Sequence, residues 1–233
     1  MTLKSEDVAT VRRDDGLAAL VHESRRLLRL LIEKTFTGRI CVAASFGAES
    51  AVLLHLVAAI DPAIPVIFGN TGKLFGETLR YRNRMVARLG LLDVRDVRPD
   101  PAYVAAEDPA GRLWLTDADR CCYLRKVEPF NLAIGDFDAV ITGRKAFHGG
   151  FRSKLETLEA SGDGKIRVNP LLAWQGHDLT TYAEDNDLPA HPLRADGYAS
   201  IGCVPCTEPA SARAGRWQGQ DKTECGIHLN ATD

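Results

Sequence analysis

The stretch GRICVAASFGAESAVLLHLVAAI, residues 38–60, decides the predicted fold. Its first part, up to Ser45, is rich in small and β-branched residues and predicts a buried strand. Its last part, from Ala51, is almost wholly apolar and predicts a helix, and the FGAES segment supplies a glycine-containing turn between the two. These residues therefore predict one β-turn-α unit. His55 lies within the apolar run and is interpreted as a packed histidine rather than a ligand.

The same alternation of helix and strand surrounds this unit. Further strands are predicted at 65–70, 91–99 and 138–143, and further helices at 17–34, 77–90 and 121–134. Strands that alternate with helices form a parallel sheet covered on both faces, so the sequence predicts an α/β fold with a parallel sheet flanked by helices. Beyond Gly143 the predicted elements are a long polar loop at 144–165, a short strand at 166–174, a helix at 178–188, and coil with short turns from Pro189. We expect one α/β domain, residues 1–189, followed by a C-terminal segment, residues 190–233.

Composition excludes several classes of function. The 233 residues are 45% hydrophobic, and 29 basic against 31 acidic side chains give a net charge of -2. A chain with this balance has no overall positive field for nucleic acid or an anionic membrane, so any anion site must be local. No segment approaches the roughly 20 apolar residues that span a bilayer, and the first residues lack a signal-peptide pattern. We therefore expect no nucleic-acid or membrane partner and a cytoplasmic location.

The SFGAES segment is a candidate phosphate loop. It lies where an open α/β sheet presents ligands, at the carboxyl end of a strand, and the next helix points its unpaired amides there. The candidate contacts are Ser45, Phe46, Gly47, Glu49 and Ser50. The pattern alone is not specific, because it lacks the lysine of a Walker loop.

Two pairs of cysteines form a candidate metal site. Cys121 and Cys122 are adjacent, whereas Cys203 and Cys206 have the CxxC spacing of many metal ligands. Four thiolates suit a tetrahedral zinc ion or an iron–sulfur cluster. Adjacent cysteines fit a single ion poorly, and a four-iron cluster offers each of them its own iron. On spacing alone, a zinc site and packed thiols remain as alternatives.

Basic residues are concentrated beside the cysteines and after the strand at 138–143. They are Arg125, Lys126, Arg144, Lys145, Arg152, Arg213 and Arg216. Because arginine forks match phosphate and sulfate oxygens, this local excess indicates a polyanionic small molecule. Solvation of the surface is the alternative explanation for part of the set.

The segment KTECGIH, residues 222–228, holds a single cysteine, Cys225, among polar residues. Most lone cysteines are small buried hydrophobes. That interpretation suits Cys225 poorly, because charged residues precede it and only Ile227 and Leu229 nearby are apolar. His148 and His228 are candidates to orient or protonate a substrate.

Taken together, these motifs resemble the assimilatory sulfonucleotide reductases, specifically the iron–sulfur class typified by adenylylsulfate reductase. The matching segments are SFGAES, NTGKLFGET, CCYLRKVEPF, GCVPCT, AGRW and ECGIH, in that family's order. The resemblance implies a Rossmann-like fold of the adenine-nucleotide α-hydrolase type with a C-terminal catalytic tail. It implies that the four paired cysteines hold a [4Fe–4S] cluster and that Cys225 is the nucleophile. It further implies a site formed by Lys126, His228, Thr71, Gly72, Arg144, Arg152, Arg213 and Arg216.

The reaction that this resemblance implies is nucleophilic catalysis by a thiolate. Cys225 would attack the sulfur of adenosine 5′-phosphosulfate (APS), displace AMP and become an S-sulfocysteine. Thioredoxin, or glutaredoxin or glutathione, would then release sulfite. The alternatives are a reductase of the 3′-phosphorylated substrate (PAPS), a metal-containing ATP pyrophosphatase that binds adenine nucleotides or modifies RNA, and a non-catalytic iron–sulfur sensor. The sequence leaves the oligomeric state open, a homo-oligomer included.

Overall fold

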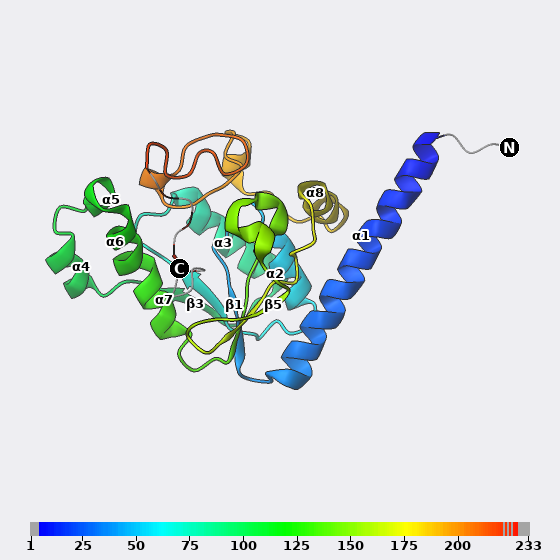
Figure 1. Ribbon diagram of the computed structural model, residues 1–233, viewed down its shortest axis with the longest axis horizontal. Helices are drawn as coiled ribbons and strands as arrows, with labels where there is room; N and C mark the ends of the chain where they lie inside the picture. The colour runs from blue at the N-terminus through cyan, green and yellow to red at the C-terminus, as the bar shows by residue number, and fades with distance from the viewer. Residues whose placement is uncertain (1–4, 221, 223, 225, 228–233) are drawn as a thin grey trace.

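The computed structural model describes residues 5–220, 222, 224, 226 and 227, with side chains from residue 16 onward. A central sheet is covered by helices, and helix α1 projects from the body toward the N-terminus (Figure 1). The strands are β1 Ile40–Ala43, β2 Val66–Gly69, β3 Val94–Val97, β4 Ala139–Ile141, β5 Leu158–Ala160 and β6 Ile166–Val168. The α-helices are α1 Ser5–Leu30, α2 Ser50–Ala58, α3 Gly76–Leu89, α4 Pro101–Glu107, α5 Leu113–Thr116, α6 Ala118–Cys122, α7 Glu128–Ala133 and α8 Gly176–Asp185. The short helical turns are the π-helical η1 Leu31–Thr35 and η2 Tyr123–Val127, and the 3-10 turns η3 Ala146–His148, η4 Gly150–Lys154, η5 Pro192–Arg194 and η6 Val204–Cys206.

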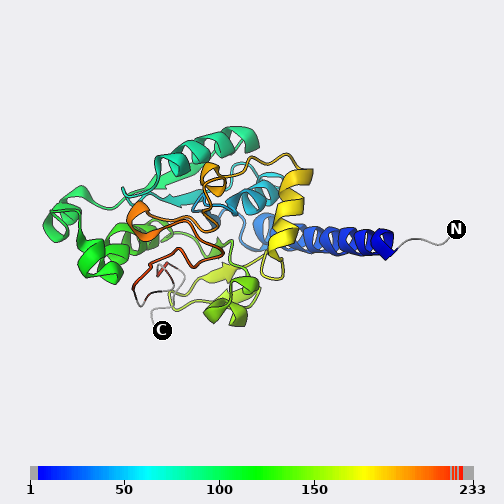
Figure 2. The ribbon, with the colours of Figure 1, turned by 90° about the horizontal axis from the view of Figure 1, so that it is seen from above.

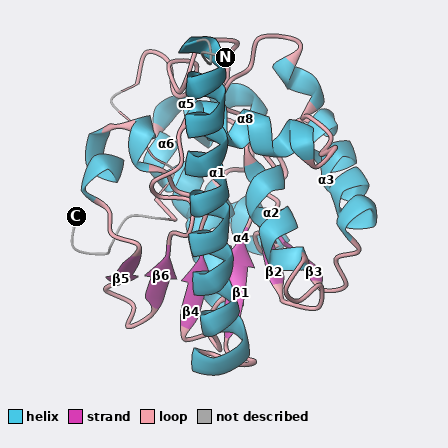
Figure 3. Cartoon of the chain, turned by 90° about the vertical axis from the view of Figure 1, so that its right-hand side faces the viewer, coloured by secondary structure: helices cyan, strands magenta, loops and turns pink. Residues whose placement is uncertain are grey.

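The strand order is β3-β2-β1-β4-β6-β5, as Figure 3 shows. All pairings are parallel except that of β5 with β6, which is antiparallel. The chain runs outward from β1 to β2 and β3 on one side, then returns to place β4 on the other side of β1. In open α/β sheets a ligand crevice forms where the strand order reverses in this way. The topology therefore places a candidate site at the carboxyl ends of β1 and β4.

Both faces of the central strands β1, β2 and β4 are buried, as their apolar sequences predict. Val42 packs in the larger core beneath α1, α2 and α8, whereas its neighbour Cys41 points to the opposite face, against Phe130 and Ile134 of the α7 region. Successive residues of a strand point to opposite faces, so β1 contributes to both cores. Burial raises the pKa of Cys41 to about 12, so this thiol is an inert part of the core. His55 packs as predicted, with Nδ1 2.9 Å from the hydroxyl of Tyr182.

The structure corrects the predicted elements at several places. The helices α4 and α5 lie where no element was predicted, and the strand predicted over 166–174 ends at Val168. The helix predicted from residue 17 begins at Ser5. The helix predicted over 121–134 is interrupted by the π-helical turn η2. Residues 144–165, predicted as a loop, contain η3, η4 and the strand β5. Strand β5 lies at the edge of the sheet and has only three residues, with Leu158 and Ala160 exposed and Glu159 partly buried, so it has no buried apolar face for a pattern to detect.

The C-terminal segment follows α8 as coil with the short turns η5 and η6, as predicted. Figures 1 and 2 both place it, in orange to red, beside α5 and α6. The Gln220 side chain donates to the carbonyl of Trp114, and Lys222 pairs with Asp119. An isolated bridge between Leu74 and Cys203 joins the same segment to the loop after β2. Of the helices in the described part of the chain, none has the length and apolar character needed to cross a bilayer.

Candidate active site

A cleft of about 740 Å³ opens at the carboxyl ends of β1 and β4, where the topology predicts a ligand. This volume is within the range of small-molecule and cofactor pockets. Of the predicted site residues, the cleft is lined by Ser45, Gly47, Glu49, Ser50, Lys126, Arg144, Arg152, Arg213 and Arg216. A larger hollow, of about 910 Å³, runs along α1 and contains none of the predicted site residues.

Hydrogen bonds and one buried aromatic side chain fix the loop that follows β1. The Gly47 N–H donates to the hydroxyls of Ser50 at 3.0 Å and Ser45 at 3.3 Å, which fixes the turn into α2. Phe46 has a positive φ of 48°, and its side chain is fully buried with its ring edge-on to Phe68. The Phe46 side chain therefore anchors the loop in the core and does not line the cleft. The other residues of SFGAES face the cleft.

Glu49 is the centre of a buried ionic group in this loop. Its carboxylate lies 2.5 Å from Nζ of Lys145 and 3.3 Å from Nε2 of His148. Burial alone would raise the pKa of Glu49, but the hydrogen bond from His148 and the charge of Lys145 lower it to about 2. Glu49 is therefore ionised at neutral pH. Neither partner was predicted to pair with Glu49, because both are distant in the sequence, and the contact with Lys145 spans 96 residues.

Arg144 holds the edge of the sheet as well as lining the cleft. Its Nη2 donates to Glu159 at 2.5 Å, and its Nε donates to Asn169 at 3.0 Å and to Thr142 at 3.2 Å. Glu159 belongs to β5, and Thr142 follows β4. The Arg144 guanidinium was predicted to contact substrate. In the structure it also links β5, a strand that the sequence did not predict, to Thr142 at the end of β4.

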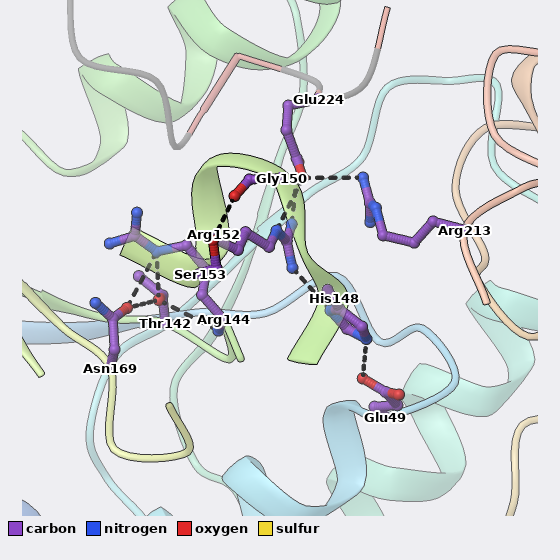
Figure 4. Close-up of polar contacts among 10 residues, drawn as sticks. All are labelled: Glu49, Thr142, Arg144, His148, Gly150, Arg152, Ser153, Asn169, Arg213 and Glu224. Atoms are coloured by element: carbon purple, nitrogen blue, oxygen red, sulfur yellow. Dashed lines mark hydrogen bonds and ion pairs between the residues drawn. The ribbon is translucent and has the colours of Figure 1, made fainter. Parts of the chain in front are cut away.

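Arg152 and Arg213 converge on one carboxylate that the sequence analysis did not single out, that of Glu224 (Figure 4). Arg152 donates from Nε to Oε1 at 2.8 Å and from Nη2 to Oε2 at 3.0 Å, and Arg213 Nη2 lies 3.2 Å from Oε1. Arg152 also donates from Nη1 to Nδ1 of His148 at 3.1 Å. His148 therefore connects this arginine pair to Glu49, so the phosphate loop and the tail share one polar network.

Arg216 and Lys126 join the cleft to the cysteine pairs. The guanidinium of Arg216 stacks 4.3 Å from the ring centre of Trp217 and donates from Nε to the carbonyl of Cys206 at 3.3 Å. Lys126 lies on η2, four residues after Cys122, and lines the cleft. Both cations lower the pKa of the Cys206 thiol, against the opposing effect of burial. The cations predicted to act on substrate therefore also face the sulfur atoms.

The four paired cysteines come together although the pairs are far apart in sequence. All four are free thiols, and Cys121 and Cys122 end α6 while Cys203 and Cys206 flank η6. Burial, followed by the neighbouring thiols of Cys203 and Cys122, raises the pKa of Cys206 to about 11. Burial also raises the pKa of Cys121, with contributions from Cys203 and Cys206. Each of these pKa shifts includes a contribution from a cysteine of the other pair, so the two pairs lie within electrostatic range of each other.

The arrangement of the four thiols bears on the kind of metal group that they could hold. Within residues 5–220, 222, 224, 226 and 227, no group of three or more His, Cys, Asp or Glu side chains is arranged to hold one metal ion. A four-iron cluster bound by four cysteines gives each thiolate a separate iron, so the sulfur atoms need not meet at one point.

The surroundings of the thiols contain the remaining predicted contacts. The hydroxyl of Thr71 lies 3.2 Å from Sγ of Cys203, and Arg125 Nη1 donates to the Thr71 carbonyl at 3.3 Å. Thr71 and Gly72, predicted to contact substrate, therefore lie beside the cysteines rather than among the residues that line the cleft. Arg125 is itself paired with the buried Asp108 at 2.7 Å. Nothing in the sequence indicated Asp108, because an aspartate before a proline is a common turn residue.

Two predicted catalytic residues, Cys225 and His228, lie outside the described residues. The described residues around Cys225 in the chain are placed against the site. Glu224 lies in the cleft, and Ile227 packs against the apolar cluster beneath α7. Gly226 has a φ of 86°, and a Cβ there would lie 3.1 Å from Cγ2 of Val127. A side chain at position 226 would therefore both strain the backbone and crowd η2.

Comparison with known proteins assigns this arrangement to a family. The model of the phosphoadenosine phosphosulfate reductase domain matches residues 39–209. An adenosine 5′-phosphosulfate reductase of Mesorhizobium japonicum is 47% identical, over 94% of this chain and 91% of the relative. A phosphoadenosine 5′-phosphosulfate reductase of Gloeobacter violaceus is 36% identical, over 84% of each chain. The crystal structure of a phosphoadenylyl-sulfate reductase from Candida auris, a phosphate complex, has the same fold, with a TM-score of 0.66, 24% identity, and coverage of 89% of this chain and 99% of that one.

Proposed function

The chain belongs to the phosphoadenosine phosphosulfate reductase family, and we propose that it uses thioredoxin to reduce APS to sulfite and AMP through an S-sulfocysteine on Cys225. It is an oxidoreductase of sulfate assimilation. The observation that supports this function best is the cleft itself, in which the phosphate loop after β1 faces Lys126, Arg152, Arg213 and Arg216. A phosphate loop opposite several cations suits a nucleotide that carries a second anionic group.

Binding depends on the loop and the cations. The amides at the start of α2 and the hydroxyls of Ser45 and Ser50 suit the 5′-phosphate. Lys126 and Arg216 lie on the cysteine side of the cleft, where they would neutralise the sulfonate. A thiolate that approaches an anion is repelled, so these preorganised charges lower the barrier to the attack.

Chemistry begins at Cys225. Its thiolate attacks the sulfur of APS, the sulfur–oxygen bond to phosphate breaks, and AMP leaves with the bonding electron pair. The enzyme then carries a Cys–S–SO3⁻ group. A thioredoxin thiolate attacks Sγ of Cys225 and expels sulfite, and the second thioredoxin thiol resolves the mixed disulfide, which returns Cys225 to its reduced form. His228, three residues after Cys225, is proposed to favour the thiolate.

Cys121, Cys122, Cys203 and Cys206 are proposed to hold the [4Fe–4S] cluster. When bound, the cluster supplies a compact charge distribution at the edge of the cleft rather than the two electrons, which come from thioredoxin. Burial raises the pKa of Cys206 to about 11, and Arg216 and Lys126 oppose this shift and favour the thiolate that a cluster would need. We place the enzyme in the cytoplasm, because reduced thiols and thioredoxin coexist there.

A reductase of PAPS is the second candidate, and the name of the Gloeobacter violaceus relative favours it. The test is a comparison of kcat/KM for APS and PAPS with thioredoxin as reductant. We expect APS to be preferred. Equal values, or a higher value for PAPS, would contradict the proposed substrate.

A further inference from the structure

Glu224 occupies a place in the cleft that suits an external anion. Its carboxylate is held by both arms of the Arg152 guanidinium and by Arg213, and the residue is only 7% exposed (Figure 4). Two arginines around one carboxylate form the arrangement by which proteins recognise phosphate and sulfonate groups. In this structure the anion between the two arginines is the carboxylate of Glu224, a group of the protein itself.

Two other cations that line the cleft are also paired with carboxylates of the protein. Lys145 is paired with Glu49, and Arg144 is paired with Glu159. Both of those pairs join residues of the sheet and its first loops. Glu224 differs, because it comes from the C-terminal tail and is the residue immediately before Cys225 in the chain.

The contacts of Arg152 limit how a ligand can reach it. Its Nε and Nη2 point at Glu224, and its Nη1 points at His148. A phosphate or sulfonate that approached this guanidinium while Glu224 stayed in place would set two anions against each other in a buried site. Such repulsion is strong where water is scarce. A ligand anion can therefore bind Arg152 only in exchange for the carboxylate.

We propose that Glu224 is an internal competitor for the anionic group of the substrate at the Arg152–Arg213 pair. Binding of the phosphosulfate group replaces the carboxylate, so part of the binding free energy is spent on breaking the contacts of Glu224 with the two arginines. The proposal rests on the proposed function, because it takes APS as the ligand. It adds a residue of the chain that lowers the affinity of the cleft for its substrate.

The test measures nucleotide binding without turnover. In a Cys225→Ser background, the dissociation constants of APS and of adenosine are determined by calorimetry with and without Glu224→Gln. The amide keeps the size of the side chain and removes its charge. We expect APS to bind about tenfold more tightly to the Gln variant, because one charge-assisted contact no longer has to be broken. Adenosine carries no anionic group, so its affinity should be the same in both.

Two control variants separate competition from other effects of the substitution. Asp163→Asn removes one negative charge from the pair with Arg167, 2.6 Å apart and outside the cleft, and tests the effect of net charge. Asp119→Asn removes the partner of Lys222 and loosens the tail without freeing an arginine of the cleft. Neither should tighten APS binding. Glu224→Asp, whose shorter carboxylate reaches the two arginines less well, should give an intermediate gain and serves if the Gln variant folds poorly.

An unchanged or weaker affinity for APS in the Gln variant would overturn the proposal, as would an equal gain for adenosine. An equal gain for Asp119→Asn would also overturn it, because loosening of the tail would then be sufficient. Failure of the proposed function is distinguishable from these outcomes. In that case the parent protein would neither bind APS nor release sulfite from it with thioredoxin.

Discussion

Gly202 lies directly beneath the guanidinium of Arg216, so closely that a Cβ at position 202 would be 2.3 Å from Nη2 and 2.5 Å from Cζ. Non-bonded heavy atoms do not come this close, so the side chain of Arg216 would have to move. The glycine before Cys203 thus leaves the space in which Arg216 stacks on Trp217 and faces the cleft. Position 202 must therefore be small so that Arg216, a proposed substrate contact, can occupy its place beside the cysteine motif.

Gly202→Ala should therefore reduce activity more than stability. The methyl group displaces the end of a flexible side chain rather than backbone, so the free energy of unfolding should change by less than about 1 kcal/mol. The displaced charge should lower kcat/KM for APS about 10- to 100-fold, less than the roughly 100- to 1,000-fold for removal of a preorganised donor, because Arg216 moves and is not lost. Gly16→Ala, where nothing lies within 4 Å, is the matched control and should leave kcat/KM unchanged. Equal kcat/KM for Gly202→Ala and the parent enzyme would contradict this role of the glycine.

The cluster proposal predicts different spectra for variants of different cysteines. Anaerobically purified protein should contain about four iron and four sulfide per chain, as a [4Fe–4S] centre requires. Cys203→Ser should lose both the visible absorbance and the activity. Cys225→Ser should lose activity alone, and Cys41→Ala, in the core, should keep the absorbance. Stoichiometric zinc without sulfide in the parent protein would show that the site is a zinc site.

The S-sulfocysteine should accumulate when no reductant is present, because its release needs a second thiol. The paired cysteines are committed to the cluster in our proposal, and Cys41 is buried. Anaerobic enzyme incubated with APS alone should gain one SO3 group per chain, seen by intact mass and mapped to the peptide around Cys225. Thioredoxin should discharge it as sulfite. Formation of AMP without the adduct, or the adduct on Cys225→Ser protein, would place the nucleophile elsewhere.

His191 should make the stability of the fold depend on pH. Burial lowers its pKa from 6.5 to about 4, and Nε2 lies 3.1 Å from the hydroxyl of Thr78. A lowered pKa means that the unfolded chain binds the proton more tightly. The stabilisation from neutral His191 is therefore complete above pH 6.5 and is lost as the pH falls toward 4.

Replacement of this histidine should remove that dependence. Over this interval His191 should account for a loss of about 2–3 kcal/mol in the free energy of unfolding of the parent protein, a loss that His191→Gln lacks. Denaturant titrations at several pH values measure the difference. His177→Gln, at an exposed position, should keep the parental slope. The same slope in His191→Gln would show that another group carries the pH dependence.

Local sequence patterns were sufficient to predict much of the secondary structure of this protein and its family. The β-turn-α unit at 38–60, the buried strands and the coil after Pro189 were predicted because apolar periodicity and turn residues act over a few neighbours. The cysteine spacing and the tail motif likewise indicated the family, since each is a short run of sequence. Strand β5 was not predicted, because three residues at the edge of a sheet, with the apolar ones exposed, are too few to show a period.

Only the tertiary structure decided which of these residues meet. The return of the chain to place β4 beside β1 created the cleft, and it brought Lys145 to Glu49. Arg152 and Glu224 pair across 72 residues, and nothing near either residue specifies the other. Any arginine can satisfy any buried carboxylate that it reaches, so the choice of partner is made by the path of the chain and not by the residues themselves.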